Sequence, residues 1–148
     1  MDWDELFGGI DKGVNKEEQK WMFLNALLVA GIDGTIDSAE IIMLRNIQEK
    51  LGLNQKEIEE IKSNPRNVKF EPPKTKEERF AHLVDLVFVM LANGVADPRE
   101  SILVKNIAKI LGFDPNLVPI IVLKITEAIR ANQSRANIIN KISKFRFD

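Results

Sequence analysis

Six polar residues in two short glycine turns carry the side chains best suited to chemistry in this sequence. They are Asp33, Asp37 and Glu40 in the first turn, and Asn93, Asp97 and Glu100 in the second. Carboxylate and amide oxygens are the ligands that hard divalent cations such as calcium and magnesium prefer. Each turn is therefore a candidate cation site, and the asparagine makes the second turn weaker in charge.

The two turns belong to an internal repeat. Residues 16–54 align without a gap with residues 76–114, at a constant offset of 60 positions. A repeat constrains the architecture of the whole chain. Because this unit is large and occurs only twice, it predicts a pseudo-twofold domain rather than a solenoid. If the copies pair about such an axis, the two turns come close enough to share one cation.

The same residues also fit the pattern of helix capping. Asp37 with Glu40, and Asp97 with Glu100, have the spacing of a capping box, in which each side chain bonds the backbone N–H of the other residue. A cap contributes about 1 kcal/mol to stability, and Gly34 suits a tight turn with positive φ. The pattern leaves open whether the turns bind a cation or only begin helices.

A calcium-binding EF-hand loop is excluded. When Gly34 is placed at the loop position that requires glycine, Glu40 falls at the position of the bidentate glutamate. The first and third ligand positions are then Val29 and Gly31, which have no side-chain oxygen. The second copy fails in the same way.

Helix signals recur along the chain, and no segment alternates with the period of a strand. Capping residues precede apolar residues at helical spacing. The helix predicted after Asp37, for example, has a buried stripe of Ile41, Leu44, Ile47 and Leu51. The sequence therefore predicts an all-α bundle of about seven helices built from two repeats.

The whole chain, residues 1–148, is expected to form one domain. Its predicted parts are repeat one at 15–64, a linker at 65–74, repeat two at 75–131 and a C-terminal helix at 134–145. One helix of the second repeat is expected to open at Asp114 and Pro115 and to be distorted near Pro119.

Composition narrows the functional classes. The 148-residue chain has a formal net charge of −1 and no cysteine, which removes disulfides, thiol nucleophiles and zinc–thiolate sites. We expect a cytoplasmic protein with no nucleic-acid partner and no transmembrane segment.

His82 is the only histidine and aligns with Met22, so we expect it to pack between helices. With no phosphate-binding loop and no nucleophile motif, we expect no enzyme.

Both ends of the chain carry features that could contact a partner. Trp3 and Phe7 are expected to fold back on the bundle, and the alternative is an exposed anchor for a protein partner. Residues 115–148 hold six bases against two acids. The bases near the end are Arg135, Lys141, Lys144 and Arg146. We expect a solvated face there, with peripheral membrane contact as the less favoured alternative.

The acidic turns and the helices after them resemble the TerB-like family, which includes tellurite resistance protein TerB and the N-terminal domain of DjlA-type co-chaperones. The resemblance lies in the run from Ala30 to Glu40 with the stop Leu51-Gly52-Leu53, and in the run from Ala92 to Glu100 with the stop Leu111-Gly112-Phe113. It covers roughly residues 15–130. It implies an all-α, pseudo-twofold domain with a metal-associated site at the turns, in a family associated with tellurite and stress resistance.

These observations predict a non-enzymatic helical domain that binds a divalent cation, calcium or magnesium, at the paired turns. The alternative is a protein-interaction or scaffold module. In that module the turns only cap helices, and a different surface binds the partner.

Overall fold

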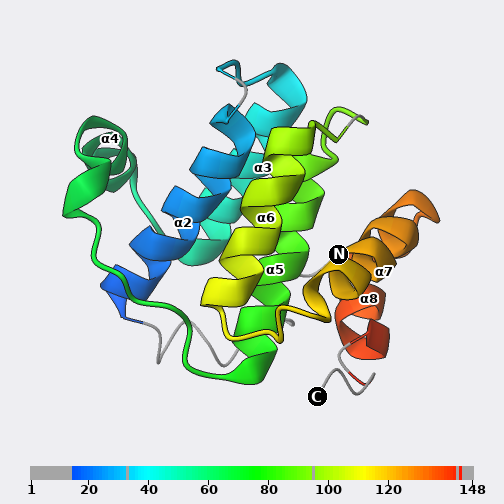
Figure 1. Cartoon of the computed structure of the whole chain (residues 1–148). Coiled ribbons are helices and arrows are strands. Elements are labelled where there is room, and N and C mark those ends of the chain that lie inside the picture. The colour runs from blue at the N-terminus through cyan, green and yellow to red at the C-terminus, as the bar shows by residue number, and fades with distance from the viewer. Residues whose placement is uncertain (1–14, 33, 95, 143, 145–148) are drawn as a thin grey trace.

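The computed structural model describes residues 15–32, 34–94, 96–142 and 144. Within these residues the chain forms seven α-helices and one 3₁₀ helix, and no strand (Figure 1). They are α2 (Lys16–Gly31), α3 (Ser38–Leu51), α4 (Gln55–Ser63), η1 (Pro65–Asn67), α5 (Lys76–Met90), α6 (Pro98–Ile110), α7 (Val118–Arg130) and α8 (Arg135–Ile142). The predicted all-α class is confirmed.

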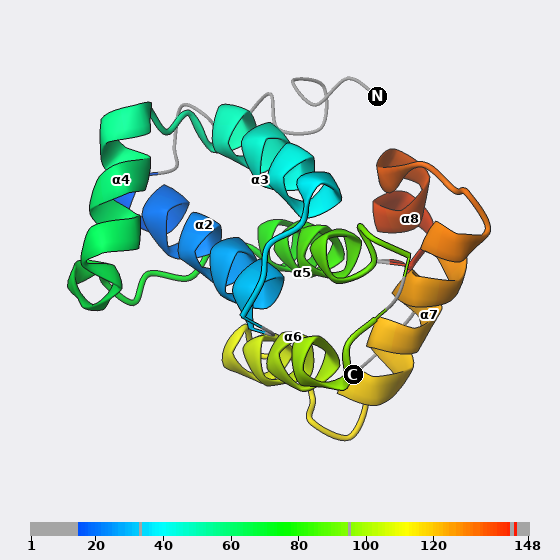
Figure 2. The same cartoon turned by 90° about the horizontal axis from the view of Figure 1, so that it is seen from above.

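Helices α2 and α5 lie side by side in the centre of the bundle. Figure 2 shows α3 covering this pair on one side and α6 on the other. Helix α4 packs against α2 at one edge, whereas α7 and α8 pack against α5 at the opposite edge. The α2–α3 turn and the α5–α6 turn, which contain the predicted cation ligands, lie at the same end of the bundle (Figure 1).

Side-chain caps fix where the helices begin. Asn15 caps α2 and Thr75 caps α5, each by accepting a hydrogen bond from the backbone N–H three residues on, at 2.9 and 3.1 Å. Asn54 and Glu57 form a reciprocal capping box at the start of α4. Gly52 ends α3 with a φ of 69°, a left-handed conformation that glycine adopts at no steric cost.

Helix α5 lies in the core. Leu83, Val84, Leu86 and Val87 of this helix have no exposed surface, so apolar residues on several of its sides are covered by neighbouring helices. Helices that are apolar nearly all round belong in the middle of a bundle. The apolar sequence of α5 thus explains its central position.

The start of α7 differs from the prediction. Asp114 and Pro115 belong to a turn, in which Asp114 Oδ1 accepts a hydrogen bond from the N–H of Asn116 at 2.9 Å, and α7 begins only at Val118. Pro119 therefore lies in the first turn of the helix, where its missing N–H has no intrahelical partner to lose. It marks the start of α7 instead of distorting an earlier helix.

Candidate functional site

In the first acidic turn, Asp37 and Glu40 cap α3. Asp37 Oδ1 accepts a hydrogen bond from the Glu40 N–H at 2.9 Å, and Glu40 Oε1 accepts one from the Asp37 N–H at 3.1 Å. This is the reciprocal box that the spacing predicts. Glu40 is only 2% exposed, so its carboxylate is largely withdrawn from solvent. Gly34 has a φ of 92°, as expected for glycine in this turn.

The second turn is built differently. Asp97 caps α6 by accepting a hydrogen bond from the Arg99 N–H at 2.7 Å, and its carboxylate also pairs with the Arg99 guanidinium at 3.1 and 3.2 Å. The Arg99 side chain, together with the backbone N–H groups of Arg99 and Glu100, holds the pKa of Asp97 below its usual value. Glu100 is 1% exposed, and Asn93 is exposed. A cation at Asp97 would have to compete with a guanidinium.

The described part of the two turns presents few oxygens to a cation. Asp37 and Asp97 act as caps, and Glu40 and Glu100 are buried. Among the described residues, no three histidine, aspartate or glutamate side chains form a group that could hold a metal ion. Asp33 lies outside the described residues, so the six-residue cation site stays a prediction.

The single histidine is buried between the two central helices. Nε2 of His82 on α5 lies 3.2 Å from Nδ2 of Asn25 on α2, and the His82 ring lies 5.8 Å from the Trp21 ring. Burial, and secondly the charge of Arg135, lowers the pKa of His82 to about 3. The imidazole is therefore neutral at neutral pH, and its expected place between packed helices is confirmed.

The basic residues near the C-terminus do not all face solvent. Arg135, at the start of α8, is 1% exposed, and its guanidinium contacts the carboxylate of Asp85 on α5 at 2.6 and 2.9 Å. The prediction that Arg135 belongs to a solvated basic face is wrong, because the residue joins α8 to the central helix. Lys141 and Lys144 are exposed, and Arg146 lies outside the described residues.

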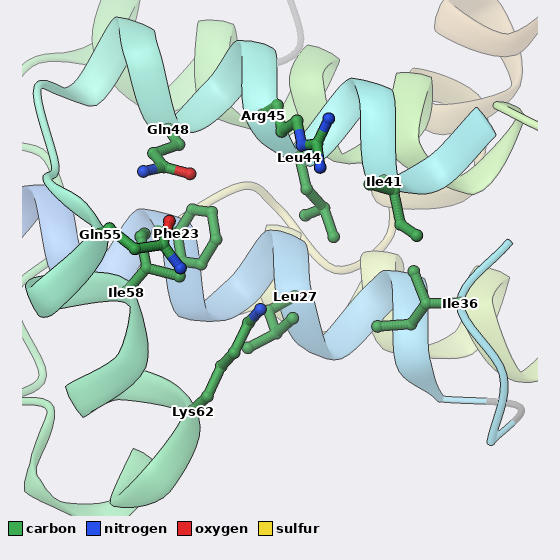
Figure 3. A pocket seen from close by; sticks show the side chains of 10 residues that line it. All are labelled: Phe23, Leu27, Ile36, Ile41, Leu44, Arg45, Gln48, Gln55, Ile58 and Lys62. Atoms are coloured by element: carbon green, nitrogen blue, oxygen red, sulfur yellow. The ribbon is translucent and has the colours of Figure 1, made fainter. Parts of the chain in front are cut away.

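A groove lies between α2, α3 and α4 (Figure 3). Helix α4 lies at the edge of the bundle away from α7 and α8 (Figure 2). Its volume is about 380 Å³, which is within the range typical of ligand pockets. Phe23 and Ile58 are each 2% exposed and Leu44 is 8% exposed, and these side chains form an apolar floor together with Leu27. The floor therefore comes from all three helices.

Ile36 and Ile41 form the apolar end of the groove, at the side of the first acidic turn (Figure 3). They are 38% and 41% exposed. The prediction that Ile41 belongs to the buried stripe of α3 is wrong, since its side chain borders the groove. Leu44 and Ile47, from the same predicted stripe, are buried as expected.

The polar residues of the groove are basic or uncharged. Arg45 of α3 and Lys62 of α4 stand on opposite sides, and Gln48 and Gln55 face each other at the end beside the α3–α4 junction (Figure 3). Gln48 Nε2 also donates to the carbonyl of Leu53 at 3.2 Å, within that junction. None of the ten described residues that line the groove is acidic, so its rim is positive.

Reasoning from the sequence missed this groove. Arg45, Gln48 and Lys62 occupy positions that look like ordinary solvated faces of amphipathic helices. The one available signal is the run from Ile41 to Leu44, four consecutive apolar residues. Such a run is wider than a single buried stripe requires and leaves apolar surface for another contact.

No helix in the described part of the chain is both long and apolar enough to cross a membrane. Comparisons of the chain with protein-family models, with characterised proteins and with solved structures give no match.

Proposed function

We propose that the chain is a protein-interaction module that binds an amphipathic, acidic segment of a partner in the groove between α2, α3 and α4. The observation that carries the proposal is an apolar floor bordered by two bases, with no acid among the described lining residues. Helical proteins commonly bind an amphipathic helix by receiving its apolar face in such a groove.

The floor supplies the attraction. Apolar side chains of the partner would be removed from water as they pack against Phe23, Leu44 and Ile58. These three side chains are already buried and are therefore fixed in position. Each large apolar side chain that becomes fully buried contributes about 1.5–3 kcal/mol before the cost of association is subtracted. A groove of this size takes only a few such anchors, so the complex is expected to be weak and reversible.

The rim supplies selectivity. Arg45 and Lys62 lie on opposite sides of the groove, so carboxylates on either flank of the partner would meet a positive charge. Exposed ion pairs contribute about 0–1 kcal/mol each. Their main effect is to orient the partner and to exclude basic segments.

In this proposal the acidic turns serve to begin helices. The reciprocal bonds of Asp37 and Glu40, and the bond from the Arg99 N–H to Asp97, support that role. Membership of the TerB-like family and cation binding at the turns stay predictions, and the proposed function does not depend on either.

Two short synthetic helical peptides would test the proposal. Both carry leucines at the same i, i+3, i+4 and i+7 positions, and the remaining surface is glutamate in one peptide and lysine in the other. Fluorescence anisotropy should show the glutamate peptide binding at least about tenfold more tightly, which corresponds to 1.4 kcal/mol. Added salt should reduce that ratio.

A matched pair of variants would locate the site. Ile41→Glu places a carboxylate in the groove beside its apolar end and should abolish binding of the glutamate peptide. Ile42→Glu is the control, because Ile42 is 60% exposed on the same helix but does not line the groove. Equal affinity for the two peptides, or equal losses in the two variants, would contradict the proposal.

A further inference from the structure

We propose that residues 3–10 of the same chain occupy this groove when no partner is bound. The inference rests on the proposed function and names the segment that a partner would have to displace. Residues 1–14 lie outside the described residues, as does the prediction that Trp3 and Phe7 fold back on the bundle.

The segment has the composition that the groove selects. Trp3, Leu6, Phe7 and Ile10 have the i, i+3, i+4, i+7 spacing of one apolar helical face. Tryptophan and other large aromatic residues are frequent anchors of binding interfaces. Between and beside these residues stand the acids Asp2, Asp4, Glu5 and Asp11. Gly8 and Gly9 weaken such a helix in isolation, so contacts in the groove would supply its order.

The described chain begins at one end of the groove. Lys16, the first residue of α2, donates from Nζ to the carbonyl of Gly52 at 3.2 Å and pairs with Glu57 Oε2 at 3.4 Å. These contacts hold the start of α2 at the α3–α4 junction, where Gln48 and Gln55 border the groove (Figure 3). The described chain therefore begins beside the groove.

The tether is long enough. Phe23 lies seven residues beyond Lys16 along α2, a rise of about 10 Å. The six steps from Ile10 to Lys16 span up to about 20 Å when extended. The segment can therefore reach the floor of the groove without strain.

Charge and tethering both favour occupation. Residues 1–14 contain four acids and one base, whereas the rim presents Arg45 and Lys62. A short tether gives an effective concentration on the order of millimolar. A contact that would be weak between separate molecules can therefore fill the groove for most of the time. A partner's apparent association constant is then its intrinsic value multiplied by the fraction of molecules whose groove is empty.

A spin label on the full-length protein tests the position of the segment. The chain has no cysteine, so a nitroxide attached to Gly8→Cys is a unique label. It should broaden the NMR methyl signals of Leu27 and Ile41 in the groove and spare Ile102, which is 61% exposed on α6. Equal broadening of the three residues would overturn the inference. Broadening that arises only between labelled and isotope-enriched copies would assign the segment to a second molecule and would also overturn it.

Competition with the glutamate peptide tests whether residues 3–10 reduce the binding of a partner to the groove. Trp3→Ala combined with Phe7→Ala should empty the groove, and the peptide should then bind about tenfold more tightly if the segment fills nine-tenths of the grooves. Lys12→Ala is the control, because it lies outside the apolar spacing. Equal binding to the wild type and the double variant overturns this inference and leaves the proposed function standing. Binding to neither protein overturns the proposed function, and the label then decides by itself whether the segment lies in the groove.

Discussion

Replacing His82 with glutamine should make the free energy of unfolding less sensitive to acid. In the folded protein His82 is 5% exposed, and its pKa falls from the ordinary value of 6.5 to about 3 because the imidazole is buried and Arg135 is nearby. In the unfolded chain the same side chain takes up a proton near its ordinary pKa. Glutamine keeps an amide opposite Asn25, the partner of His82 at 3.2 Å, so the variant is expected to fold.

The sign and size of the effect follow from linkage. Between pH 6.5 and pH 3 the unfolded chain binds a proton at His82 and the folded chain does not, so acid favours the unfolded state. The stability contributed by keeping this residue neutral is lost as the pH falls through the unfolded pKa. Between pH 7 and pH 5 the loss is about 2 kcal/mol. This loss of stability should be absent from the His82→Gln variant.

Urea unfolding at the two pH values, followed by tryptophan fluorescence, measures the difference. Carboxylates titrate in both proteins and cancel when the pH dependence of the variant is subtracted from that of the wild type. His82 is the only histidine in the chain, so the remainder belongs to this residue. An identical fall in the free energy of unfolding for both proteins would refute the argument, since it would mean that His82 can be protonated inside the folded bundle.

Asp37→Ala should cost about 1 kcal/mol in the free energy of unfolding, because α3 loses its capping box. Asp37→Asn keeps a capping oxygen and should cost less in the same urea assay, and equal costs would count against the cap. Arg135→Met should cost about 3–5 kcal/mol, because it leaves the largely buried carboxylate of Asp85 without its guanidinium partner. Adding Asp85→Leu should recover part of that loss, and strictly additive costs would disprove the coupling. Thermal melts of EDTA-stripped protein should be unchanged by calcium, magnesium or manganese, because Asp37 and Asp97 cap helices and Glu40 and Glu100 are buried. Stabilisation of about 2.7 kcal/mol at 100 times Kd, absent from Asp33→Asn, would instead establish the cation site.

The beginnings and ends of most helices could be predicted because their causes are local. The box formed by Asp37 and Glu40 needs only two residues three positions apart, and Gly52 needs only its own freedom of φ. Reasoning of this kind failed at α7, because Asp114 and Pro115 can begin a helix or a turn with equal ease. In the structure they form a turn, and α7 begins at Val118, which is buried.

The groove and the buried ion pair could not be predicted in this way. Arg135 and Asp85 are 50 residues apart, and no local sequence pattern around either residue indicates that the two form an ion pair. Ile41 fits the stripe that buries Leu44 and Ile47, and only the position of α4 beside α2 decides which side chains of α3 line the groove. Local patterns identify an apolar face, but the assembled helices determine how much of that face is covered.

The central pair of helices makes the internal repeat a poor guide to folding units. Helix α2 comes from the first half of the chain and α5 from the second, and they bury one another through contacts such as that of Asn25 with His82, which are 57 residues apart. Neither half can therefore cover its own central helix, and fragments cut at the linker should not fold independently. The whole bundle is expected to unfold in a single cooperative transition. It should also fold more slowly than a bundle in which only successive helices touch, because these distant contacts close long loops.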